Sequence, residues 1–491
     1  MLKRLKIVWG NSNNPGHVVK FGDETKQKDY HMYTGLKSQL DFSDNLMNNI
    51  LPQHHDLIKL KNILNWKKIN SIYKKCFPSK KGRSTKRTEL IIGLILLKFL
   101  YKRSDRQLIE ELEVNNAFMY FCSINHADIA LLQLKNLKRK KPVRLIDHST
   151  LVKARKKLGV TKIKEIESLF TNELIKNKII EGKQLFIDTT SLEKNILYPT
   201  EISLLKRVIE HAEMIVQKVA LKKDLMKSEV IKKTNQICKV YYSAGKKTKN
   251  LLSTTSKQLV QIAENILISA KKTMDNIPDE IKKSLAKNYQ KVISVGKTIV
   301  NQVCEKINGN SVPDKIVSYY ESHARALPKG KIHKACEFGS KLEINMSKNG
   351  YITRHVLHNG NPSDVGMLEA AVAHHYKKFK EEFKEGAADR GFYDNALIEN
   401  LKITYNIKLA IPHKKNNEIK MNIGEIALYK KRAAIEAKIS EGKRCYGLNK
   451  SLFKGNDGDT IWETLSVFAL NAKKLLKDIS GRPELIERFS T

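Results

Sequence analysis

The chain has 491 residues, of which 41% are hydrophobic, so it contains enough apolar material for two or three folded units and is not a disordered polymer. Its 90 Lys and Arg residues outnumber the 51 Asp and Glu residues, which leaves a formal net charge of +39. A surplus of this size opposes compaction by self-repulsion and predicts a polyanionic partner, of which nucleic acid is the commonest. A Lys-rich proteome is the alternative explanation for the charge.

The cysteines and the apolar runs narrow the class of protein further. The six cysteines are scattered without a Cys-x-x-Cys pair, so they suggest neither a zinc module nor a disulfide framework and fit a reducing cytosol. The N-terminal MLKRLKIVWG is basic but lacks the apolar core of a signal peptide. The most apolar run, 90–100, is far shorter than the roughly 20 residues that span a membrane. We therefore expect a cytoplasmic protein with no membrane partner.

The N-terminal third is predicted to be helical. Residues 1–50 are polar and irregular and are expected to form a lightly ordered arm. From 51 to 165 apolar residues recur at helical spacing, which predicts an all-helical domain, and a basic helix within it makes this domain the candidate DNA-binding unit. Within it, 145–159 forms a helix with one basic face, although any charged surface helix would look similar. The candidate DNA contacts on this helix are Lys153, Arg155 and Lys156.

The pattern changes near residue 183, where KQLFIDTT predicts a buried strand that ends at Asp188. Residues 205–308 are Lys-rich and amphipathic and predict a helical insertion of two to four helices. Strands are expected again at 316–321 (IVSYYE) and in a hairpin around Gly350, followed by helices and by a strand that ends at Asp389. This mixture predicts an α/β catalytic domain formed by 183–204 and 309–445, with a C-terminal helical closure over 446–491.

Three carboxylates lie where metal-dependent phosphoryl transfer needs them. Asp188 and Asp389 follow predicted strands, whose carboxyl ends can aim side chains into a cleft, and Glu436 lies on a later helix. Carboxylate oxygens are the ligands that Mg²⁺ prefers, and two such ions can activate an attacking oxygen and stabilise the leaving one. An aspartate after a strand also commonly caps a turn, so either aspartate alone would more often be structural.

Four polar residues are expected on one face of the helix that carries Glu436. Tyr429, Arg432, Glu436 and Lys443 are offset by 3, 4 and 7 residues, which keeps them on one side of a continuous helix. A carboxylate beside two cations and a tyrosine fits a phosphodiester better than a core seam, with Glu436 on metal and the cations on phosphates. The alternative is a solvated charged face with i, i+4 pairs.

Together these segments resemble the insertion-element DDE transposases of the Y-R-E-K signature group. LFIDTTSLEKNILYPTEISLL (185–205) is similar to the first-aspartate segment of that family, GAADRGFYDNALIENL (386–401) to the second, and KRAAIEAKISEGKRCYGLNKSLFKG (431–455) to the glutamate segment. Residues 316–344 are similar to the strand pair between them, and the S-D-R-Q-L and D-H-S-T-L phrases of 87–159 resemble the helical N-terminal domain. The resemblance covers roughly 80–480, and five segments in order are more specific than any one motif.

The resemblance implies a ribonuclease H-like catalytic domain, a mixed sheet with helices, in which Asp188, Asp389 and Glu436 hold two Mg²⁺ ions that Mn²⁺ can replace. It implies a DNA transposase that binds the inverted repeats of its own element and cuts and joins double-stranded DNA. It also implies a homodimer in the synaptic complex, associated with a bacterial or archaeal nucleoid. The candidate DNA contacts in this domain are Tyr429, Arg432, Lys443, Arg390 and Lys331.

The position of the insertion departs from some relatives. Only 436 − 389 = 47 residues separate Asp389 from Glu436, so the β-rich insertion that some relatives carry there is absent. The long insertion lies between the two aspartates instead, which leaves open whether a DNA hairpin intermediate forms. Two other functions also stay open: an inactive transposase-derived DNA-binding protein, and a ribonuclease H-like nuclease without strand transfer.

Overall fold

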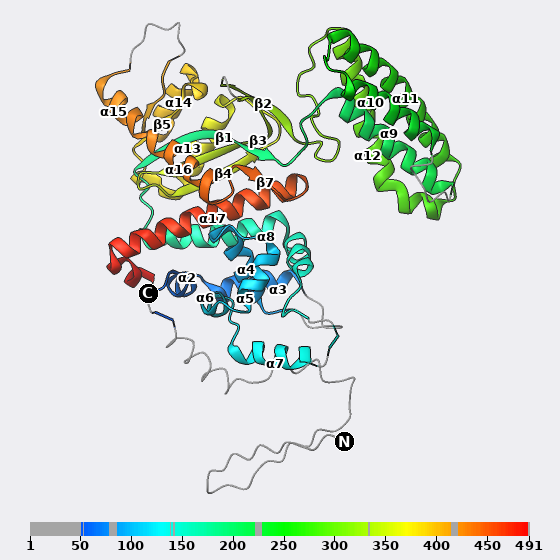
Figure 1. Cartoon of the computed structure of the whole chain (residues 1–491). Helices are drawn as coiled ribbons and strands as arrows, with labels where there is room; N and C mark the ends of the chain where they lie inside the picture. The colour runs from blue at the N-terminus through cyan, green and yellow to red at the C-terminus, as the bar shows by residue number, and fades with distance from the viewer. Residues whose placement is uncertain are drawn as a thin grey trace, which may run out of the picture.

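The computed structural model describes residues 51–489 except 53, 78–85, 138, 141–142, 221–227, 332–333 and 414–420, and except the side chains of 330–335. The expected N-terminal arm, 1–50, lies outside the described residues. In chain order, the described part consists of N-terminal helices, a mixed sheet with its covering helices, and a helical bundle inserted after the first strand (Figure 1).

The N-terminal part is helical, as the apolar spacing predicts. Its helices are α2 (Asp56–Ile63), α3 (Trp66–Cys76), α4 (Thr88–Leu100), α5 (Asp105–Leu112), α6 (Asn116–Phe121), α7 (His126–Leu137) and α8 (His148–Lys176). The almost wholly apolar α4 is buried on all sides, which is the pattern of a core helix. Ser104 and Asp147 cap α5 and α8, because each side chain accepts a hydrogen bond from a backbone N–H of the first turn. Among the described helices, none is long and apolar enough to cross a membrane.

The sheet is built around its first strand. This strand, β1 (Gln184–Lys194), pairs antiparallel with β3 (Lys334–Ser347), and β3 in turn pairs with β2 (Arg325–Lys331) and β4 (Ile352–His358). On its other side β1 is parallel to β5 (Glu385–Ala388), which is parallel to β6 (Lys408–Ala410), and the short β7 (Lys450–Ser451) extends the end of β1. The order β4-β3-β1-β5-β6, antiparallel and then parallel, confirms the expected ribonuclease H-like class of mixed α/β fold.

Helices cover both faces of this sheet. Leu185 and Ile187 of β1 share a core with α13 (Val365–Phe379) and α14 (Asn395–Tyr405). On the opposite face, Phe186 shares a core with α15 (Ile423–Lys431) and α16 (Ala433–Cys445). The short turns η2 (Lys380–Glu382) and η3 (Arg390–Phe392) flank β5, and η4 (Pro483–Phe489) ends the described chain.

The C-terminal helix α17 (Gly455–Gly481) connects the sheet to the N-terminal helices. It lies between the sheet and α8 (Figure 1) and contributes Phe468 to the core shared with α4 and α8, and Leu470 to the core under the sheet. The sequence predicts a closing helix over 461–476, and the observed helix extends beyond it at both ends. Because α17 joins them, the N-terminal helices and the sheet form one continuous core.

The insertion is a bundle of α9 (Glu201–Val219), α10 (Glu229–Ser243), α11 (Lys249–Asp275) and α12 (Asp279–Ile307). Its helices pack around their own core, in which Val208, Leu259 and Ile299 are fully buried. The bundle stands apart from the sheet, beyond the ends of β1 and β2 (Figure 1). Its helix count lies within the predicted two to four.

Three predictions of secondary structure are wrong. The stretch IVSYYE is not a strand, since the first strand after the insertion begins at Arg325. Its Ile316 packs on the bundle, where the Gln302 side chain bonds both backbone groups of Ile316 at 2.9 and 3.0 Å. The first strand does not end at Asp188 but continues to Lys194. Finally, the helix around Glu436 is divided at Arg432 into α15 and α16.

Candidate active site

The register of the parallel strands brings the two aspartates together. Ile187 of β1 is paired with Ala388 of β5, so Asp188 and Asp389 are the next residues on the two neighbouring strands. Asp389 lies just beyond the end of β5, where its exposed Oδ1 accepts a hydrogen bond from the backbone N–H of Arg390 at 2.7 Å. Residues 201 positions apart in sequence (389 − 188) thereby adjoin at one edge of the sheet.

The alternation of side chains decides which face the two aspartates share. Phe186 and Ala387, two residues before Asp188 and Asp389, both pack in the core under α15 and α16. Side chains two residues apart in a strand point to the same face. Both aspartates therefore face the helices that carry the third acid, Glu436.

Arg432 links the first acid to the third. Its Nη1 donates to Oδ2 of Asp188 at 3.0 Å, and its Nη2 donates to Oε1 of Glu436. The Arg432 side chain is only 10% exposed, whereas that of Glu436 is 57% exposed. The buried guanidinium therefore fixes the position of α16 relative to β1.

The environment of Asp188 carries an excess of negative charge. The pKa of Asp188 is raised to about 6, chiefly by burial and also by the neighbouring Asp389 and Glu436, while Arg432 and the Thr189 backbone N–H oppose the rise. A perturbed carboxyl beside other carboxyls is typical of functional sites. Such a group of charges favours a bound cation.

The donor set of this site fits a hard divalent cation. Asp188, Asp389 and Glu436 offer only oxygen donors, which Mg²⁺ and Mn²⁺ prefer. In the part of the chain that the structure describes, no three His, Cys, Asp or Glu side chains lie close enough to form a ready metal site. The Arg432 guanidinium bonds two of the acids instead, so a metal ion would compete with Arg432 for Asp188 and Glu436.

The other signature residues surround this group. The ring of Tyr429, on α15, lies 5.2 Å from the Arg432 guanidinium. Lys443 is half-buried on α16, and Arg390 is exposed beside Asp389. Lys331 ends β2, but its side chain lies outside the described part. Arg432, which is expected to contact a DNA phosphate, has its guanidinium turned toward the acids in this structure.

The basic helix of the N-terminal region presents two of its three candidates to solvent. Lys153 and Lys156 are exposed on α8. Arg155 is buried, and its Nη1 donates to Oδ1 of Asp105 at 3.1 Å while its guanidinium lies 4.7 Å from the ring of Phe453. The prediction of Arg155 as a DNA contact is therefore corrected: it is part of a buried ion pair.

One residue near the site has a role that the sequence does not reveal. Asp364, at the N-terminus of α13, makes no side-chain cap bond to that helix. Its Oδ1 accepts hydrogen bonds from Thr189 Oγ1 at 3.2 Å and Lys341 Nζ at 3.0 Å. A Cβ at Gly391 would lie 2.7 Å from Asp364 Oδ2, so the turn after Asp389 packs directly on this carboxylate. The glycine directly after the Asp389-Arg390 pair is the sequence feature that hints at this contact. The hydrogen-bond donors Thr189 and Lys341 lie too far from Asp364 in sequence to be inferred.

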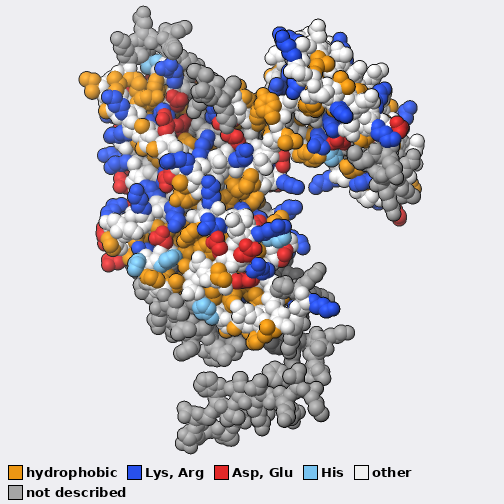
Figure 2. Space-filling model, viewed as in Figure 1, with side chains coloured by type: hydrophobic (Ala, Val, Ile, Leu, Met, Phe, Trp, Pro, Cys, Tyr) orange, Lys and Arg blue, Asp and Glu red, His pale blue; other side chains and the backbone are white. Residues whose placement is uncertain are grey.

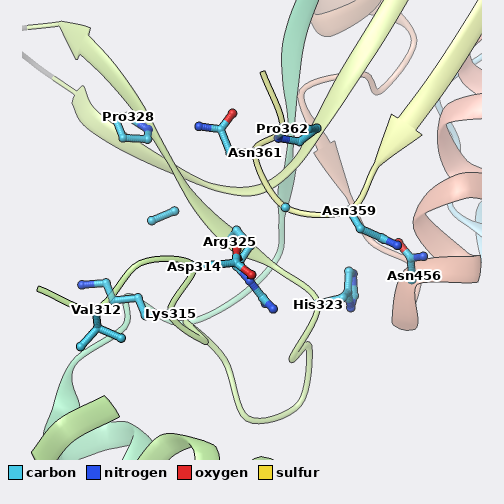
Figure 3. Close-up of a pocket in the computed structure, with 12 residues that line it drawn as sticks. Val312, Asp314, Lys315, His323, Arg325, Pro328, Asn359, Asn361, Pro362 and Asn456 are labelled. Atoms are coloured by element: carbon cyan, nitrogen blue, oxygen red, sulfur yellow. Dashed lines mark hydrogen bonds and ion pairs between the residues drawn. The ribbon is translucent and has the colours of Figure 1, made fainter. Parts of the chain in front are cut away.

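A separate pocket of about 860 Å³ lies where the insertion rejoins the sheet (Figure 3). Asp314 and Arg325 lie together in it, Asn359 and Asn456 adjoin at one side, and Asn361 lies near Pro362 (Figure 3). The pocket contains none of the three acids. The candidate site is therefore identified by its three carboxylates and not by this pocket.

Two family models match the chain. The Transposase domain model matches residues 45–157, and the Transposase DDE domain model matches residues 315–472. The second match contains Asp389 and Glu436 but begins after the insertion, so the position of Asp188 in the site rests on strand register and on its bond to Arg432. No curated protein and no solved structure matches the chain significantly.

Proposed function

The chain belongs to the insertion-element DDE transposases, and on that premise we propose that it binds the inverted repeats of its own element, cuts the DNA there and joins the freed end to target DNA. The observation that carries this proposal is the convergence of Asp188, Asp389 and Glu436 around Arg432. Hydrolysis of a phosphodiester at the element end would leave a 3′-hydroxyl. Attack of that hydroxyl on a target phosphodiester would form one P–O bond and break another.

The three acids would hold two Mg²⁺ ions, for which Mn²⁺ can substitute. The ions would supply activation of the attacking oxygen and stabilisation of the leaving oxygen. The protein itself presents carboxylates from two adjoining strand ends and one helix. Arg432 would exchange its carboxylate partners for a DNA phosphate, since a guanidinium binds both kinds of anion through the same pair of N–H groups.

Exposed cations around the site and on α8 would position the DNA. Contacts to phosphates add affinity and orientation without reading sequence. Two element ends must be brought together before joining, so a homodimer on DNA is part of the proposal. The residues proposed for these contacts are Lys153, Lys156, Lys331, Arg390, Tyr429 and Lys443.

Cleavage by a conservative variant of Asp389 tests the proposal. Purified protein with Mg²⁺ or Mn²⁺ is incubated with DNA that carries the inverted repeats flanking its own gene, and products are resolved on a denaturing gel. Asp389→Asn keeps the acceptor for the Arg390 N–H but loses the charge, and should reduce cleavage at least 100-fold, about 3 kcal/mol in the barrier.

Asp394→Asn is the matched control. Asp394 is an exposed aspartate five residues away (394 − 389), and its side chain caps α14 through the Leu397 N–H, a role that asparagine fills equally well. This variant should cleave normally. Binding without cleavage by the wild type in either metal would reject the enzyme in favour of a DNA-binding relic. Cleavage without joined products would leave a nuclease.

A further inference from the structure

The inserted bundle is a body of its own, attached through a narrow neck. Its four helices share a separate core, and the chain that returns from it packs on α12 through Ile316. At the neck, Lys194 at the end of β1 lies 3.2 Å from Glu321 on the returning segment. The proposed reaction uses no residue of this bundle. The function of the bundle's exposed surface is therefore a separate question.

The helix α12 contains a lysine-rich stretch. From 281 to 304 it has five lysines and no Asp or Glu, while Asp279 and Glu280 stand in its first turn and Glu305 in its last. Lys283, Lys287 and Lys297 are exposed, and at 3.6 residues per turn they fall within about 80° of one another. In the described part of the chain, none of these three lysines pairs with a carboxylate. The three ammonium groups are therefore exposed to solvent along one face of α12 and form no salt bridge in the described part of the chain.

The exposed face of α11 shows how an ordinary charged helix differs. Lys257 and Lys271 lie on one face of α11, and Glu264 lies between them, seven residues from each. All three side chains are exposed. Seven residues are about two helical turns, so this glutamate divides the basic face of α11. The α12 face therefore has no acid between its lysines, whereas the α11 face carries charges of both signs.

We propose that the exposed face of α12, formed by Lys283, Lys287 and Lys297, binds the sugar-phosphate backbone of double-stranded DNA; this inference rests on the proposed action on DNA. The 14 residue steps from Lys283 to Lys297 span about 21 Å of helix, which matches about six phosphate spacings along one strand. The contact is to phosphates, so it is independent of DNA sequence.

The composition of the face favours DNA over a second copy of the chain. The side chains between these lysines on the same face are polar, namely Gln290 and Ser294, and they are exposed. The centres of protein interfaces are depleted in lysine and enriched in aromatic residues. A polar lysine face with no acid between Lys283 and Lys297 is complementary to a polyanion instead.

The arrangement of the bundle makes such a contact useful. Lys and Arg side chains line both sides of the gap that separates the bundle from the rest of the molecule (Figure 2). A duplex bound to the α12 face would be held at a second place, away from the three acids. The neck connects that contact directly to β1, which carries Asp188.

The salt dependence of DNA binding by the full chain tests the inference. Lys283→Gln, Lys287→Gln and Lys297→Gln are combined, while Lys291 is left intact because its Nζ donates to the Tyr320 carbonyl oxygen at 3.0 Å. Each lost phosphate contact lowers the slope of log K against log salt by about 0.9, so the triple variant should lose up to about 3 units of slope. Its affinity for a duplex of the element end should fall at least tenfold at about 0.1 M salt.

The control removes the same charge from α11 through Lys257→Gln, Lys271→Gln and Lys272→Gln, and should change slope and affinity by less than a third as much. Equal losses in the two triple variants would overturn the inference, because net charge alone would then explain them. An unchanged slope with a changed oligomeric state in light scattering would also overturn it, in favour of a second copy. Either failure would leave cleavage at the Asp389 site intact, so it would not bear on the proposed reaction.

Discussion

A buried charged histidine should make the stability of this protein depend on pH in an unusual direction. His355 on β4 lies between Glu463 of α17, at 2.6 Å from its Nδ1, and Glu167 of α8, at 3.5 Å from its Nε2. Burial lowers the pKa of His355, but the two carboxylates outweigh burial and raise it to about 10. The imidazolium therefore joins the sheet to two helices at neutral pH.

The sign and size of the effect follow from proton linkage. The pKa of His355 in the folded chain is above its value of 6.5 in the unfolded chain, so the folded state holds one more proton between these values. The stabilisation is fully present below pH 6.5 and is lost as pH rises through 10. Between pH 7 and pH 9 the free energy of unfolding should fall by about 2 to 3 kcal/mol.

Urea unfolding at pH 7, 8 and 9 measures this slope. His355→Gln should be less stable at pH 7, because two buried glutamates lose their cation, and should show a much shallower slope than the wild type between pH 7 and pH 9. His358→Gln is the control. His358 lies three residues after His355 on β4 and bonds Glu343 of β3. Burial lowers the pKa of His358, so this side chain is neutral throughout this range. Equal slopes in the wild type and His355→Gln would refute the reasoning.

Two further substitutions separate structural from positioning roles. Arg155→Met should lower the free energy of unfolding by about 3 kcal/mol, since the partly buried Asp105 loses its bidentate partner and keeps only Lys98. It should leave the salt slope of DNA binding unchanged, and a reduced slope in a folded variant would restore Arg155 as a DNA contact. Asp364→Asn should slow cleavage about tenfold with DNA affinity unchanged, because it weakens the hydrogen bonds to Thr189 and Lys341 that hold the strand of the first acid in place. Single-turnover cleavage measures the rate and a binding titration measures the affinity. An unchanged rate would remove the positioning role.

Local signals predict much of the fold. Apolar spacing predicts the N-terminal helices and the bundle, and Gly350, with φ +84°, occupies the expected turn between β3 and β4. The error at 316–321 has a clear cause. Ile316 and Tyr319 are buried in the way that a strand residue would be, but they pack on helices of the insertion. A short apolar run reports burial and does not identify the surface against which it is buried.

The candidate site divides in the same way. The positions of Asp188 and Asp389 after apolar runs are visible in the sequence, and the strand register joins them. The burial of Arg432 is not visible, because it depends on an aspartate 244 residues away. Arg155 likewise reads as one cation in a basic run, and only the fold supplies its partner Asp105, 50 residues earlier.

The bundle also affects how the sheet can form during synthesis. Glu193 of β1 pairs with Gly339, which the ribosome adds 339 − 193 = 146 residues later, or roughly 7–30 s at usual elongation rates. An unstructured loop of that length would make the pairing of β1 with β3 entropically costly. A bundle with its own core can fold during this interval, and its folded form brings Lys194 and Glu321 into contact. The order of synthesis thus favours folding of the bundle before the sheet. The folded bundle then holds the end of β1 close to the segment that leads into β2 and β3, so that the strands pair without closing a long free loop.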